Sequence, residues 1–63
     1  MDRLESFEKM LADVQRSYQE TVERMAALKA QGKEKTVTFR QLMGSKLTYQ
    51  TMLSMYKSYG LVD

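Results

Sequence analysis

The sequence predicts an all-α protein: a two-helix antiparallel hairpin that assembles as a homodimeric four-helix bundle. Three observations lead to this prediction. The first half carries an unbroken helical repeat of apolar residues, two glycines stand where helices would end, and the chain contains no proline. Proline is the strongest helix breaker, so its absence suits long continuous helices. We expect one helical-hairpin domain over residues 1–63.

The first helix is predicted to span about residues 3–31. Asp2 is placed as its N-cap, and Gly32 is placed as the left-handed residue that follows its last turn. The apolar positions alternate steps of three and four, which is the a/d spacing of a coiled coil and predicts one core-facing stripe. That stripe comprises Leu4, Phe7, Leu11, Val14, Tyr18, Thr21, Met25 and Leu28.

The second helix is predicted to span about residues 39–59, with Thr38 as its N-cap. Gln41 stands three residues after Thr38, which is the spacing of a capping box. Val37 and Leu42 are placed as the accompanying hydrophobic staple. These signals predict that the helix begins at the residue after Thr38.

The predicted C-terminus of the second helix is a Schellman motif. Gly60 is placed to adopt the left-handed conformation, and Leu61 then closes back on Tyr56. The turn between the helices is short, which makes them antiparallel neighbours. The predicted hairpin core is Phe7, Leu11, Val14, Tyr18, Met25, Leu28, Phe39, Leu42, Tyr49, Leu53 and Tyr56.

The register of the hairpin is predicted by centring the turn near Lys35. This register places Val14 opposite Tyr56. The first helix is longer than the second, so Leu4 and Phe7 are expected to overhang, with the tail after the second helix reaching back towards Phe7.

The second helix is apolar nearly all round, and a helix of that kind is normally buried. Only Arg40, Lys46 and Lys57 interrupt it with charge, so one companion helix would not cover it. A second copy related by two-fold symmetry is the simplest cover, although a tetramer or swapped helices would serve as well. The surface predicted to meet another copy or another partner comprises Leu4, Met43, Leu47, Met52, Met55 and Tyr59.

A small chain can bury little apolar surface, which limits its stability as a monomer. A compact globule of 7.4 kDa would bury roughly 6,500 Å² on folding, worth about 95 kcal/mol if 60% of that area is apolar. Ordering 63 residues costs about the same, at roughly 1.5 kcal/mol each. A two-helix rod buries less than a globule, which favours an oligomer.

The composition argues against catalysis, metals and cofactors. The chain has no cysteine and no histidine, and no motif for a nucleophile or a phosphate loop. The glutamate pairs Glu5–Glu8 and Glu20–Glu23 lie away from the apolar stripe and are expected on a solvated face. We therefore expect no enzyme and no cofactor, but a non-catalytic interaction or structural module.

Two further possibilities concern nucleic acid. The second half is mildly basic, and its tyrosines would be stacking groups in a nucleic-acid-associated protein, which is the alternative function. Gly44 also stands where a helix-turn-helix motif has its turn glycine. Dispersed cations and a net charge of +2 make a weak electrostatic footprint, so nucleic acid is an unlikely partner.

No segment predicts contact with a membrane. The start of the chain lacks the apolar stretch of a signal peptide, and no stretch approaches the roughly 18 apolar residues of a membrane span. We expect a cytoplasmic protein whose partners are itself, most simply as a homodimer, and beyond that a larger protein.

Overall fold

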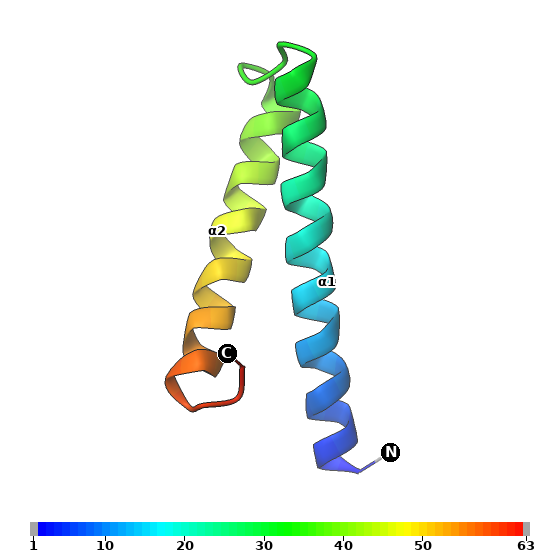
Figure 1. The fold of residues 1–63 in the computed structure, drawn as a ribbon, viewed down its shortest axis with the longest axis vertical. Coiled ribbons are helices and arrows are strands. Elements are labelled where there is room, and N and C mark those ends of the chain that lie inside the picture. The colour runs from blue at the N-terminus through cyan, green and yellow to red at the C-terminus, as the bar shows by residue number, and fades with distance from the viewer. Residues whose placement is uncertain (1, 63) are drawn as a thin grey trace.

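The computed structural model describes residues 2–62 and contains two α-helices in this range. Helix α1 spans Arg3–Ala30 and helix α2 spans Val37–Ser58. The two pack side by side in antiparallel directions, joined at one end by a short connection (Figure 1). The molecule measures 44 × 24 × 17 Å. The all-α hairpin is confirmed.

Helix α1 begins and ends as predicted, to within one residue. The Asp2 carboxylate accepts a hydrogen bond of 2.7 Å from the backbone N–H of Glu5. At the other end, Gly32 has a φ of 71°, and the N–H of Lys33 donates to the carbonyl of Leu28 over 2.9 Å. This bond and the positive φ define a Schellman motif, which satisfies carbonyls that the helix leaves free.

The N-terminus of α2 differs from the prediction, because the N-cap is Thr36 and not Thr38. The Thr36 hydroxyl accepts a hydrogen bond of 3.2 Å from the N–H of Phe39, and it donates one of 2.8 Å to the carbonyl of Lys33. The helix therefore starts at Val37, two residues earlier than expected. Val37 is 69% exposed, so it forms no hydrophobic staple.

Helix α2 runs without interruption through Gly44. No turn occurs there, so the helix-turn-helix interpretation is wrong. The helix ends in the predicted Schellman motif: Gly60 has a φ of 72°, and the N–H of Leu61 donates to the carbonyl of Tyr56 over 3.0 Å. Both glycines thus supply a backbone conformation that other residues rarely adopt.

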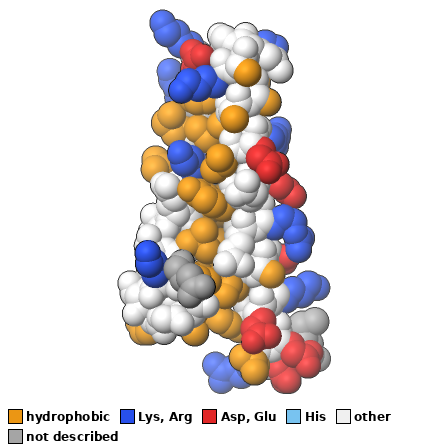
Figure 2. Space-filling view, viewed as in Figure 1, with side chains coloured by type: hydrophobic (Ala, Val, Ile, Leu, Met, Phe, Trp, Pro, Cys, Tyr) orange, Lys and Arg blue, Asp and Glu red, His pale blue; other side chains and the backbone are white. Residues whose placement is uncertain are grey.

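The contact between the helices is a single line of apolar side chains, visible along the seam between them in Figure 2. Only two of the described residues are buried, Val14 and Thr21. The Thr21 hydroxyl donates to the carbonyl of Ser17 over 2.7 Å, so its burial leaves no polar group unpaired. A core of this size leaves most large side chains partly in water.

The register at the open end of the hairpin differs from the prediction. Phe7 does not overhang: its ring packs edge-on against Tyr56, with centroids 5.6 Å apart and an angle of 86°. Tyr56 was expected opposite Val14, which is about two helical turns away from Phe7. Leu4 does remain 66% exposed, as expected for a residue beyond the reach of α2.

The first prediction concerns the N-cap of α2. Thr36→Ala should lower the free energy of unfolding by about 1 kcal/mol, because the N–H of Phe39 loses its acceptor. Thr38→Ala is the matched control, since Thr38 is exposed within the helix, and it should leave stability unchanged or slightly raised. Urea unfolding followed by circular dichroism at one protein concentration measures both. A larger loss from Thr38→Ala than from Thr36→Ala would restore the sequence-based cap.

The second prediction concerns the register. A double-mutant cycle with Phe7→Leu and Tyr56→Leu should give a coupling of about 0.5–1.5 kcal/mol, the usual range for an edge-to-face pair. The control cycle combines Phe7→Leu with Tyr49→Leu, and the two changes should add to within about 0.5 kcal/mol. Equal coupling in the two cycles would contradict the observed register.

Candidate interaction surface

The predicted core residues line the contact between the helices, but most are only half-buried. Val14 is buried, at 7% exposure. The others are of intermediate exposure: Phe7, Leu11, Tyr18, Met25, Leu28, Phe39, Leu42, Tyr49, Leu53 and Tyr56. Two contacts join these stripes directly: Phe7 packs on Tyr56, and Tyr18 accepts a hydrogen bond from α2. For the other members of the set, a place in the core remains a prediction.

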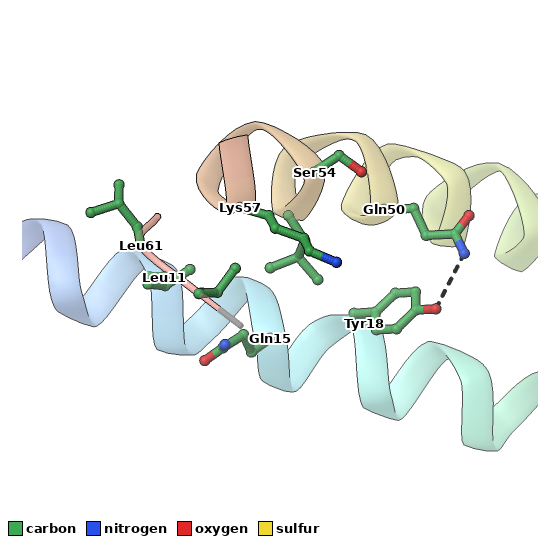
Figure 3. Close-up of a pocket in the computed structure, with 9 residues that line it drawn as sticks. Leu11, Gln15, Tyr18, Gln50, Ser54, Lys57 and Leu61 are labelled. Carbon is green, nitrogen blue, oxygen red and sulfur yellow. Dashed lines mark hydrogen bonds between the residues drawn. The ribbon is translucent and has the colours of Figure 1, made fainter. Parts of the chain in front are cut away.

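A cleft of about 750 Å³ opens between α1 and α2 on the side of the chain termini (Figure 3). At its inner end, the side-chain amide of Gln50 donates a hydrogen bond of 3.3 Å to the Tyr18 hydroxyl, joining the two helices. Leu11 and Leu61 line its apolar part, and Lys57 extends into it from α2. The cleft is therefore amphipathic.

An unpartnered surface with exposed apolar side chains lies on α2, on the side turned away from α1. Its exposed apolar side chains include Leu47 at 56% and Met55 at 60% exposure. We call this surface the outer face of α2. It consists of Val37, Arg40, Gln41, Met43, Gly44, Leu47, Thr48, Thr51, Met55, Ser58 and Tyr59, all of them exposed.

The predicted interface residues divide between the two helices. Met43, Leu47, Met55 and Tyr59 belong to the outer face of α2, and Tyr59 is 81% exposed. Met52 is half-buried on the flank of this face, where it lines an apolar hollow of about 210 Å³ with Met55 and Tyr56. Leu4 stands apart at the start of α1. Their role in association remains a prediction.

Gly44 lies near the middle of the outer face, with open space where a side chain would stand. A Cβ added there would have no atom within 4 Å beyond its own stretch of helix. Helix α1 therefore does not approach α2 closely at this glycine. A glycine inside a helix costs about 1 kcal/mol relative to alanine, and nothing in the hairpin offsets that cost.

The hydroxyl groups of the outer face are already paired. Thr48 donates to the carbonyl of Gly44 over 3.1 Å, Thr51 to Leu47 over 3.0 Å, and Ser58 to Ser54 over 3.0 Å. A satisfied hydroxyl can be covered by another helix without leaving a buried group unpaired. The face is therefore compatible with burial despite its threonines.

Charge is sparse on the outer face. Arg40 is the only charged residue of the outer face, and α2 contains no acidic residue. Lys46 is half-buried and forms no ion pair with Glu20, and Lys57 lines the cleft. Lys46 and Lys57 are about three helical turns apart and lie on the same side of α2, whereas Arg40 lies on another side. Three cations divided between two sides of a helix do not make a continuous track for a phosphate backbone.

The carboxylates do not form a site. Glu5, Glu8, Glu20 and Glu23 are all exposed, as the sequence predicts. Within residues 2–62, no three acidic side chains come close enough together to hold a metal ion. Neither α1 nor α2 is both long and apolar enough to cross a membrane.

Comparison of the chain with protein-family models, with curated proteins and with solved structures found no match. The outer face of α2 offers apolar contact area, satisfied hydroxyls and one charge.

Proposed function

We propose that this chain is a non-catalytic interaction module that acts by self-association. Two hairpins form a four-helix bundle, with the two copies of α2 at its centre and the two copies of α1 outside. The observation that carries the proposal is the outer face of α2, a run of exposed apolar side chains that α1 leaves uncovered. Such a module acts by contact between helices and not by catalysis.

The exposed area of the hairpin supports association. The chain exposes 5096 Å², whereas a compact protein of 7.4 kDa exposes about 4,200 Å². The difference is about 900 Å². A standard protein–protein interface buries about 800 Å² on each partner. One helix-on-helix contact would thus remove about as much surface as the hairpin has in excess.

A second copy fits the outer face for reasons of charge and of side-chain type. With Arg40 as its only charge, the face brings few repelling groups to a symmetric contact. Met43 and Met55 are unbranched and polarizable, and such side chains adapt to an apolar partner surface. A larger protein that presents an apolar helix would meet the same face, so self-association and hetero-association share one surface.

The third prediction tests this surface. Leu47→Glu should raise the dissociation constant of the dimer at least about tenfold, because the contact would have to bury an unpaired carboxylate. Sedimentation equilibrium over a range of protein concentrations measures it. Ala12→Glu is the matched control: it adds the same charge at an exposed position of α1 and should leave the dimer unchanged.

Two results would overturn the proposal. The first is a parent chain that sediments as a well-folded monomer at micromolar concentration. The second is equal weakening of the dimer by Leu47→Glu and Ala12→Glu, which would mean that net charge, and not the outer face of α2, controls association.

A further inference from the structure

We infer that the two copies of α2 pack antiparallel, with a two-fold axis between Thr48 and Thr51, so that Met55 of each copy fills the gap above Gly44 of the other. This inference rests on the proposed self-association and adds its orientation and register. It starts from two unexplained features of one face, a glycine with open space above it and a long, exposed thioether.

The central line of the outer face repeats at steps of four and three along α2. It consists of Val37, Gln41, Gly44, Thr48, Thr51, Met55 and Ser58. This is the spacing of a coiled-coil seam, in which each side chain enters a gap between residues of the facing helix. An axis between Thr48 and Thr51 maps the part of the line within residues 41–58 onto itself and sets Gly44 opposite Met55.

Side-chain size favours this register over the next one. With the axis between Thr48 and Thr51, the smallest residue of the line meets its longest apolar one, at both ends of the contact. Moving the axis by one step, to between Gly44 and Thr48, sets these two small residues opposite each other twice at the centre. That arrangement would leave empty space where helices normally interlock.

Side-chain size also favours the antiparallel direction. A symmetric parallel pair sets each residue of the line opposite itself, so Gly44 would meet Gly44 of the second copy and leave empty space. Charge agrees, because a parallel pair would hold the cations of two helices without acidic residues at the same levels. In the antiparallel pair the two Arg40 residues are about 28 Å apart along the axis.

The orientation is tested with single cysteines, because the natural chain has none. Thr48→Cys labelled with ¹⁵N is mixed with unlabelled Thr51→Cys, unfolded and refolded together, and oxidised in a glutathione buffer. Mass spectrometry then separates mixed from like-with-like cross-linked dimers. The inferred register brings Thr48 opposite Thr51, so mixed dimers should clearly exceed the half that random pairing gives. Like-with-like pairing in excess would show a parallel dimer and overturn the inference, and a random mixture would overturn the register.

The role of Gly44 is tested with Gly44→Ala. The added methyl group occupies the gap meant for Met55, so the dissociation constant should rise at least about tenfold. Ser45→Ala, the neighbouring exposed position, controls for the higher helix propensity of alanine and should leave the dimer unchanged or tighter. A dimer that Gly44→Ala leaves unchanged or tightens would overturn the inference. A parent chain that is a monomer overturns the proposed function itself, so the two failures are distinct.

Discussion

A helix that packs against one neighbour can cover only one of its sides, and this constraint governs the whole molecule. Helix α1 satisfies this constraint, because its core-facing apolar residues lie on one stripe and its acidic residues face water. Helix α2 does not, because apolar and hydroxyl side chains occupy its outer face as well. The shallow seam, with Val14 as its one buried aliphatic residue, is the direct result. The proposed association would cover this outer face of α2.

The sequence predicted the helices best where a residue type has a single use. Gly32 and Gly60 end the helices as expected, because a positive φ is costly for any other residue. The predicted N-cap of α2, Thr38, was wrong because Thr36 is a second threonine that can take this position. Thr36 takes the role since Lys33 ends the first Schellman motif and its carbonyl then accepts from the Thr36 hydroxyl. The connection leads directly into the cap, and Val37 joins the helix although it gains no burial.

The register of the hairpin was less predictable, because the apolar repeat fits several alignments about equally well. The two helices diverge towards the chain termini (Figure 1), and the cleft that opens there is bridged by long side chains. Phe7 and Tyr56 reach each other across this end, which an alignment counted outward from the turn does not anticipate. The empty space above Gly44 could not be predicted from the sequence either, since a glycine within a helix is compatible both with a close contact and with open space.

The contacts that hold the hairpin together differ from the features that would select its partner. Contacts in the seam are apolar and shallow, so they favour helical pairing without strongly specifying one arrangement. The outer face of α2 has what the seam lacks: a glycine with open space above it, at a fixed spacing from Met55. This arrangement penalises a wrong register, because a misaligned pair would leave a void above Gly44. If two copies pair there, folding and association form one equilibrium, and the stability of the chain depends on its concentration.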